Sequence, residues 1–296
     1  MGARVTGIDL SKPLTESEFC TIHEAWIRHL VLVFPNQKLS PADMVSFSRK
    51  FGELDDFENQ VVHRDSEFKE VMTLTNKLQN GQQSKTYNAG QNWHTDQSYS
   101  LRPAKATCVY CIEKPSVGGD TMFANMYLSY ETLSSKMQEF LDGLDAIHDA
   151  SLIEGLEKRG ADVVAEFKHK NPPVVHPAIR THPESGKKAL YINERVRQFV
   201  GLSESESRPL INFLCNHSIS ARFTYRHYWS VDDLVMWDNR CLIHLAVGDY
   251  DPKEIRHMLR TSGKGDHFGH LASPLQKTDT SIPKSELDRR VSALYD

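Results

Sequence analysis

Short runs of apolar residues, either alternating with polar ones or uninterrupted, recur along most of this chain and predict β-strands of about four to eight residues. The clearest is Val31–Phe34, an uninterrupted stretch typical of a buried strand. Two runs that flank a turn containing Pro and Gly predict a hairpin over residues 174–181 and 188–193. Similar runs predict strands at residues 2–10, 70–75, 106–113, 120–124, 144–150, 222–229, 234–237, 242–245 and 255–262.

Five other segments have the signals of helices. A Ser or Thr followed three residues later by Glu forms a capping box, and Pro is favoured at the first helical position. The predicted helices start after Thr15, Ser40, Asn125 and Ser203, and residues 152–170 form a charged helical insertion. The second of these helices is expected to end at Gly52, and the third at about Leu141.

Many short strands, few helices and no regular βαβ alternation favour an antiparallel double sheet over a parallel nucleotide-binding sheet. No G-x-G-x-x-G motif and no P-loop is present, which removes dinucleotide and ATP chemistry from consideration. We expect residues 1–296 to form one catalytic domain with a peripheral C-terminal tail over about 270–296.

Composition narrows the function further. The chain has a net charge of −4, with 39% hydrophobic and 25% charged residues, which argues against nucleic-acid binding through phosphate neutralisation. No apolar run reaches the roughly 18 residues of a membrane span, and the N-terminus lacks the pattern of a signal peptide. The five cysteines are scattered, and Cys108 and Cys111 should face opposite sides of a strand. These features predict a reduced, cytoplasmic protein that does not bind membranes.

The candidate chemistry is concentrated in residues 91–100 (QNWHTDQSYS), whose Thr, Tyr and Trp residues favour a strand. In a strand, His94 and Asp96 project to one face with Cα atoms roughly 6.6 Å apart. An imidazole nitrogen and a carboxylate oxygen can then converge on one metal ion. A lone His-x-Asp is more often a polar strand without a metal, so a third ligand is needed.

Residues 77–90 (KLQNGQQSKTYNAG) lead directly into this segment and contain almost no apolar residue. A connection of that length is either an active-site lid or a disordered loop, and the sequence leaves both open.

His244 is the best candidate for the third ligand, because it is a polar residue inside the apolar run 242–246 and must be hydrogen-bonded or metal-bound if buried. Just downstream, Arg256 and Arg260 should share one strand face about 13 Å apart. Two guanidiniums that face a protein interior require anionic partners. Their spacing suits two different carboxylates, or a carboxylate and another oxyanion.

In this order, the motifs His94-x-Asp96, Gly118-Gly-Asp-Thr121, Trp237-Asp-Asn-Arg240 with His244, and Arg256-x-Met-x-Arg260 resemble those of one family. It is the taurine / 2,4-dichlorophenoxyacetate dioxygenase family of Fe(II)- and 2-oxoglutarate-dependent oxygenases. The resemblance covers roughly residues 2 to 265 and implies a mainly β fold with flanking helices, the double-stranded β-helix (jelly roll or cupin-like barrel).

The resemblance also implies roles for single residues. His94, Asp96 and His244 would form the facial triad of a non-haem Fe(II) site. The distal carboxylate of 2-oxoglutarate would be held by Thr121 and Arg256. On the substrate side, the resemblance points to Arg260, Gln97, Tyr99 and His63.

Such an enzyme uses O2 to convert 2-oxoglutarate to succinate and CO2 while it hydroxylates a C–H bond of a second substrate. Arg260 predicts a small anionic substrate: a sulfonate, an alkyl sulfate, a phenoxyalkanoate or another carboxylate. Where the hydroxylated carbon bears a sulfonate, sulfate or aryl ether, the product would collapse with cleavage of that bond. Family members are commonly dimers or tetramers. The alternatives are a cupin-type metallohydrolase or isomerase with the same ligands, and a binding protein without turnover.

Overall fold

The computed structural model describes residues 1–60, 62–78 and 90–273. Its largest sheet has the order β1-β2-β13-β5-β15-β4-β3, in which β1 and β2 are parallel and every other neighbouring pair is antiparallel. These strands are β1 (Ala3–Arg4), β2 (Val31–Phe34), β3 (His63–Arg64), β4 (Met72–Thr75), β5 (Ala104–Glu113), β13 (Leu234–Asp238) and β15 (His257–Lys264).

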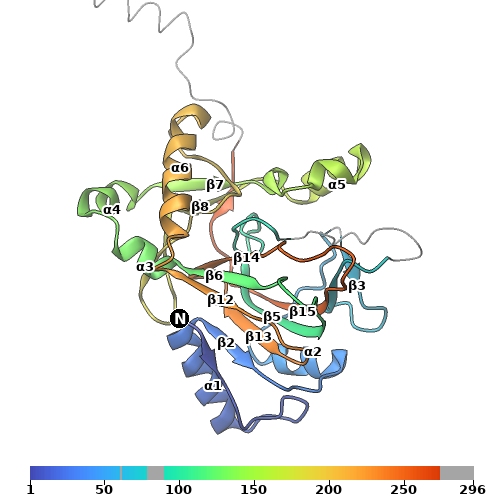
Figure 1. The fold of residues 1–296 in the computed structure, drawn as a ribbon. Helices are drawn as coiled ribbons and strands as arrows, with labels where there is room; N and C mark the ends of the chain where they lie inside the picture. The colour runs from blue at the N-terminus through green and yellow to red at the C-terminus, as the bar shows by residue number, and fades with distance from the viewer. Residues whose placement is uncertain (61, 79–89, 274–296) are drawn as a thin grey trace, which may run out of the picture.

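The remaining strands form antiparallel sheets that face or extend the large one. Three strands have the order β12-β6-β14, four have the order β11-β7-β8-β16, and β9 and β10 form a hairpin. They are β6 (Thr121–Asn125), β7 (Asp145–His148), β8 (Val174–Pro177), β9 (Ile179–Thr181), β10 (Lys188–Leu190), β11 (Val196–Phe199), β12 (Thr224–His227), β14 (Leu242–Ala246) and β16 (His270–Leu271). This architecture is a jelly roll, as predicted (Figure 1).

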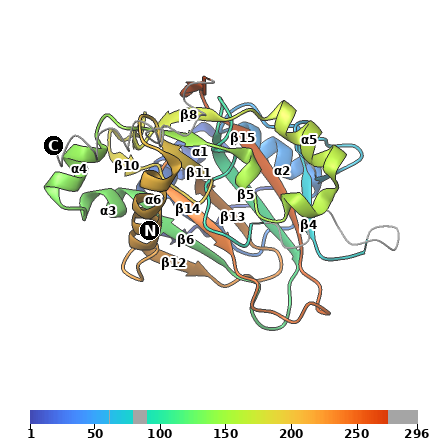
Figure 2. The same cartoon turned by 90° about the horizontal axis from the view of Figure 1, so that it is seen from above.

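The helices lie outside the sheets. Helices α1 (Glu16–His29) and α2 (Pro41–Arg49) pack under the outer face of the large sheet, whereas α3 (Met126–Glu131), α4 (Ser135–Leu141) and α6 (Glu204–Ser218) lie together at another side of the molecule, with α6 beside β7 and β8 (Figures 1 and 2). The predicted capping boxes at Thr15 and Ser203 are both present. No helix in the described ranges is both long and apolar enough to cross a membrane.

Two hydrophobic clusters build the core, one on each side of the large sheet. Alternation along β5 sends Cys111 to the inner cluster and Cys108 to the outer cluster, which confirms that the two cysteines face opposite ways. The inner cluster fills the space between the sheets and includes Phe123 and Trp237, whose ring centroids are 5.4 Å apart. The site described below opens beside this pair.

Several predicted elements differ in detail. The helix expected from Asn125 to Leu141 is two helices, because Ser134 caps a new one through the Met137 amide. The expected insertion at 152–170 consists of two 3-10 turns (Ala150–Leu152, Leu156–Arg159) and α5 (Ala161–Lys170).

The two predicted outer segments lie mostly outside the described residues. At the start of the predicted peripheral tail, His270–Leu271 pairs with β8 as an exposed strand, and Ala272 is buried. Residues 274–296 lie outside the described residues, and so do residues 79–89, which make up most of the segment predicted as a lid or a disordered loop.

Candidate metal and 2-oxoglutarate site

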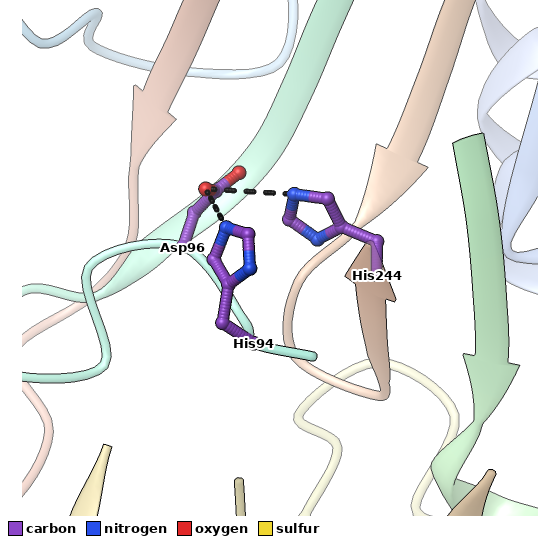
Figure 3. Close-up of side chains that lie close together, drawn as sticks. All are labelled: His94, Asp96 and His244. Atoms are coloured by element: carbon purple, nitrogen blue, oxygen red, sulfur yellow. Dashed lines mark ion pairs between the residues drawn. The ribbon is translucent and has the colours of Figure 1, made fainter. Parts of the chain in front are cut away.

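Three buried side chains from distant parts of the chain point toward one another in Figure 3. Asp96 Oδ1 lies 3.6 Å from His94 Nε2 and 3.7 Å from His244 Nε2. Two donors that each bind one ion at about 2.1 Å are at most about 4.2 Å apart, so these distances suit a shared metal ion. The structure therefore brings together the three residues that the sequence put forward as ligands.

The local backbone differs from the sequence prediction. Residues 91–100 do not form a strand: His94 makes an isolated bridge with His244, and a turn follows it. Each backbone amide of the pair donates to the other carbonyl, at 3.0 and 2.8 Å. Gln97 has a φ of +52°, a left-handed conformation that ends any extended segment. The bridge sets the separation of the two imidazoles, and the turn brings Asp96 beside them.

Asn239 holds this turn in place. Its carbonyl accepts from Thr95 Oγ1 at 2.7 Å, and its Oδ1 accepts from the Asp96 amide at 3.3 Å. Its Nδ2 donates to Thr107 Oγ1, whose hydroxyl donates to Asp96 Oδ2 at 2.8 Å. Trp237 Nε1 also donates to Asn239 Oδ1. One oxygen of Asp96 is thus fixed by the protein, while Oδ1 faces the imidazoles.

The electrostatic surroundings favour the metal-binding protonation states. Burial opposes the charge on Asp96, but Arg260 and the two imidazoles outweigh it and hold the pKa of this carboxyl well below its usual range. Burial, with a contribution from Arg195, lowers the pKa of His94. Burial, with a contribution from His94, holds the pKa of His244 well below the usual value. At neutral pH the site is one carboxylate and two neutral imidazoles.

Hydrogen bonding also fits a metal. His94 Nδ1 donates to the Asn92 carbonyl at 2.7 Å, which leaves the lone pair of the neutral ring on Nε2. His244 Nδ1 has no hydrogen-bond partner among the described residues. Its ring is positioned by the backbone bridge to His94 and by packing against Trp237, with ring centroids 4.7 Å apart. Two imidazoles and one carboxylate are the ligand set of non-haem Fe(II) sites.

The residues expected to hold 2-oxoglutarate line the same cavity, namely Thr121 and Arg256. Thr121 Oγ1 accepts from Trp229 Nε1 at 3.0 Å, and Arg256 Nε donates to the Gly119 carbonyl at 2.9 Å. Arg256 has no carboxylate within ion-pair distance in the described part of the chain. A Cβ on Gly119, which has φ +70°, would lie 2.8 Å from Pro115 and 3.4 Å from Arg256 Cδ, so glycine lets the arginine approach.

Three of the four residues expected on the substrate side also line the cavity: Arg260, Gln97 and Tyr99. Arg260 Nη2 lies 3.0 Å from Asp96 Oδ1 and donates to Ser262 Oγ at 3.0 Å. Gln97 donates to Asp55. His63 lies on edge strand β3, opposite Thr73, and is not among the described lining residues.

Several residues at the site had no role in the sequence analysis. Asn239 and Thr107 support Asp96 through hydrogen bonds, Trp229 supports Thr121, and Arg195 adds a cation to the cavity. Asn239 belongs to the motif Trp237-Asp-Asn-Arg240, so the sequence could have identified this residue as part of the site. The others act across more than a hundred residues of sequence or lie in segments without a motif.

Comparison with known proteins agrees with this geometry. The family model described as "Taurine catabolism dioxygenase TauD, TfdA family" matches residues 1–262. An alpha-ketoglutarate-dependent 2,4-dichlorophenoxyacetate dioxygenase of Cupriavidus pinatubonensis is 35% identical over 89% of this chain and 94% of its own. An alkylsulfatase of Acinetobacter baylyi is 30% identical over 96% and 88%, respectively.

Solved structures give the same answer for the fold. The crystal structure of AAD-2 in complex with Mn(II) and N-oxalylglycine superimposes with a TM-score of 0.79 at 28% identity, covering 92% of this chain and 96% of that one. Together with the family model and the buried His-Asp-His cluster, these matches settle the class. The chain belongs to the TauD/TfdA family and is a 2-oxoglutarate-dependent non-haem iron dioxygenase.

Proposed function

We propose that this dioxygenase hydroxylates a C–H bond of a small organic oxyanion and releases succinate and CO2. The class of substrate includes sulfonates, alkyl sulfates, phenoxyalkanoates and other carboxylates. If the hydroxylated carbon bears a sulfonate, sulfate or aryl ether, the product collapses and that bond breaks. The names of the relatives support this class, since they include a phenoxyacetate dioxygenase and an alkylsulfatase.

The observation that carries the proposal is a cavity in which buried metal ligands, unpaired arginine and apolar side chains meet. His94, Asp96 and His244 would hold iron, which supplies the oxidising power when 2-oxoglutarate and O2 are bound. Thr121 and Arg256 would bind the distal carboxylate of 2-oxoglutarate, because Arg256 offers a planar fork of donors without a protein carboxylate.

The other end of the cavity would hold the prime substrate. Arg260 supplies a positive charge for its oxyanion, and Gln97 and Tyr99 line the path to it. Leu156 and Phe167, from the segment predicted as an insertion, add an apolar wall. Those apolar groups exclude water from the carbon that reacts and strengthen the charge–charge contacts nearby. His63 would contribute only if its side chain turned toward the cavity.

Two expectations about the molecule as a whole belong with this proposal. We propose a cytoplasmic location, because all five cysteines are free. We propose a dimer or tetramer, as expected from the family resemblance. Size-exclusion chromatography with light scattering tests the second expectation.

The test uses protein purified without oxygen and loaded with Fe(II). We expect succinate release that depends on 2-oxoglutarate, on O2 and on a member of a panel of sulfonates, alkyl sulfates, phenoxyalkanoates and amino acids. His244→Ala should abolish it. Turnover of a panel member without O2, or with zinc in place of iron, would contradict the proposal and favour a metallohydrolase.

The division of labour between the arginines has a separate test. Arg260→Ala should raise KM for the prime substrate far more than KM for 2-oxoglutarate, and the reverse result would refute the assignment. Because Arg260 also contacts Asp96, the iron content of this variant must be measured beside its kinetics. Arg102→Ala removes an arginine of a surface pair with Glu53 and is the matched control.

A further inference from the structure

The charged residues that line the cavity are predominantly basic. Two carboxylates and four arginines face it: Asp96, Glu154, Arg159, Arg195, Arg256 and Arg260. Arg159 ends the 3-10 turn Leu156–Arg159 and Glu154 lies just before it, so this segment contributes no net charge to the lining. The interior therefore holds three guanidiniums and one carboxylate, and the carboxylate is a proposed metal ligand.

The proposed function accounts for two of these arginines, Arg256 for 2-oxoglutarate and Arg260 for the prime substrate. Iron brings two further positive charges, while 2-oxoglutarate brings two negative ones. Arg195 is left without a counter-charge among the groups that line the cavity. Arg195 is half-buried, and a cation withdrawn from water without an anionic partner is costly, so its presence here needs an explanation.

Arg195 makes little use of its donors within the described residues. Nη1 donates to the Thr95 carbonyl at 3.3 Å, and the guanidinium carbon lies 5.7 Å from the centre of the Tyr99 ring. No carboxylate lies within ion-pair distance of it in the described residues. Arginine has five N–H donors, so most of the fork remains available to a molecule in the cavity. Burial outweighs the opposing effect of the Asp96 and Glu194 carboxylates and lowers the pKa of Arg195.

The backbone at Arg195 is fixed on both sides. Its amide donates to Asn193 Oδ1 at 2.9 Å, and its carbonyl accepts from the Asp149 amide at 2.9 Å. Strand β11 begins at the next residue, Val196. The side chain therefore extends from a rigid point and is held against the Tyr99 ring, which lowers the entropy cost of binding an anion.

We propose that Arg195 is a second substrate-binding cation, and that the preferred substrate carries two negative charges. The inference rests on the proposed function. A doubly ionised head group such as a phosphonate, or two separate oxyanions such as a sulfonate and a carboxylate, would supply these charges. Arg260 and Arg195 would then each meet part of the charge, because both guanidiniums line the same cavity.

The test compares three probes that share a four-carbon chain: butanesulfonate with one charge, butylphosphonate with a doubly ionised head, and 4-sulfobutanoate with two separate anions. Binding is measured by calorimetry without oxygen, on protein loaded with Fe(II) and 2-oxoglutarate, at a pH where the phosphonate is doubly ionised. We expect at least one dianion to bind at least about tenfold more tightly than butanesulfonate. The dianion that binds more tightly identifies the arrangement of the charges.

Arg195→Gln keeps a donor for the Thr95 carbonyl and removes the charge. It should weaken binding of the preferred dianion at least about thirtyfold and that of butanesulfonate less than about threefold. Arg195→Lys restores a charge and should recover part of the difference. Arg197→Met removes an arginine two residues away that pairs with Asp149 outside the cavity, and it should alter neither affinity.

Wild-type protein that binds the dianions no better than butanesulfonate would overturn the proposal. So would an Arg195→Gln variant that weakens all three probes equally. If that variant does not fold in a thermal melt, the wild-type comparison decides alone. The proposed function fails separately, when no compound of the wider substrate panel gives O2-dependent succinate release, because binding is measured here without turnover.

Discussion

Two clusters of buried side chains in the described part of the protein have the ligand types and spacing of a metal site. They are His94, Asp96 and His244 in one cluster, and His182, Asp238 and Cys241 in the other. In each, the candidate ligand atoms lie within 4.8 Å of one another. Burial and distance alone cannot tell them apart.

In the second cluster, His182 and Asp238 have their lone pairs occupied by hydrogen bonds. His182 Nδ1 accepts from the amides of Glu184 and Ser185 at 3.2 and 3.1 Å, so its Nε2 carries the proton and donates to Asp238 Oδ2 at 3.0 Å. Arg240 donates through Nε and Nη2 to the two oxygens of Asp238, at 2.8 and 2.7 Å. This cluster is a buried, saturated ion pair.

In the first cluster, His94 Nδ1 donates a hydrogen bond, whereas His182 Nδ1 in the second cluster accepts. The His94 ring is held through Nδ1 by a carbonyl, Thr107 donates to Oδ2 of Asp96, and Oδ1 has one charged neighbour, Arg260 Nη2 at 3.0 Å. The remaining imidazole lone pairs converge on Asp96 Oδ1. The difference teaches that the placement of protons, more than the choice of residues, separates a metal centre from a structural network.

The largest expected effect comes from neutralising the carboxylate of each cluster. Asp96→Asn should lower iron affinity and turnover more than about 100-fold, because changes even in the outer ligand shell of metal sites cost about 10- to 100-fold. Asp238→Asn should retain the iron stoichiometry of the wild type in its folded fraction. For both variants, iron content after anaerobic desalting measures metal binding, and succinate release measures turnover. Equal iron loss in the two variants would show that the clusters do not differ as described.

The second effect concerns stability. Asp238→Ala leaves His182 Nε2 buried without its acceptor and leaves Arg240 with Glu184 as its remaining carboxylate partner, so we expect the free energy of unfolding of the metal-free protein to fall by about 3 kcal/mol. Urea unfolding measures it. Asp142→Ala breaks an exposed pair with Lys188 and should cost about 1 kcal/mol or less. An equally small loss of unfolding free energy for Asp238→Ala would mean that this network does not stabilise the fold.

A buried pair of histidines, His148 and His176, adds a third case, in which His176 Nε2 donates to the Ser100 carbonyl at 3.1 Å. His148 and His176 have ring centroids 5.1 Å apart, and neither ring nitrogen of His148 has a partner among the described residues. Burial and Arg180 lower the pKa of His176 to about 4, and burial with His176 holds the pKa of His148 well below its usual value. Both rings are therefore neutral in the folded protein at neutral pH.

This pair predicts a pH dependence of stability. Between about pH 6.5 and pH 4 the unfolded chain binds more protons than the folded one, so the free energy of unfolding falls as the pH drops, by about 3 kcal/mol for His176 alone. Urea unfolding at several pH values measures the slope. His176→Phe should flatten it, whereas His169→Gln, at an exposed site, should not. An unchanged slope in His176→Phe would contradict the assignment.

Much of the fold could be predicted because its signals are local. The capping boxes at Thr15 and Ser203 and the apolar run Val31–Phe34 each specify an element within a few residues, and the structure contains all three. The segment 91–100 could not be predicted, because its turn depends on hydrogen bonds from Thr95 and Asp96 to Asn239, more than 140 residues away. Propensity favoured a strand, and tertiary contacts overrode it.

The candidate site divides in the same way. His94, Asp96 and His244 were recognisable from residue type, spacing and motif. Arg195 was not, because its importance comes from the cavity it enters and from the lack of a carboxylate nearby. The second cluster of His, Asp and Cys also shows that a search for three metal-ligating residue types would return a structural network together with the true site.

The smallest expected effect comes from replacing Cys241, the third member of the second cluster. Burial raises the pKa of this thiol well above its ordinary value, and Asp238 adds to the shift, so the sulfur stays protonated and cannot act as a thiolate ligand. Cys241→Ala should therefore leave zinc and iron binding unchanged, and should cost only about 1 kcal/mol for the small cavity it leaves. Metal titration monitored by calorimetry, together with urea unfolding, tests both parts. Loss of one equivalent of bound zinc in the variant would turn the second cluster into a metal site and reverse the distinction drawn from its hydrogen bonds.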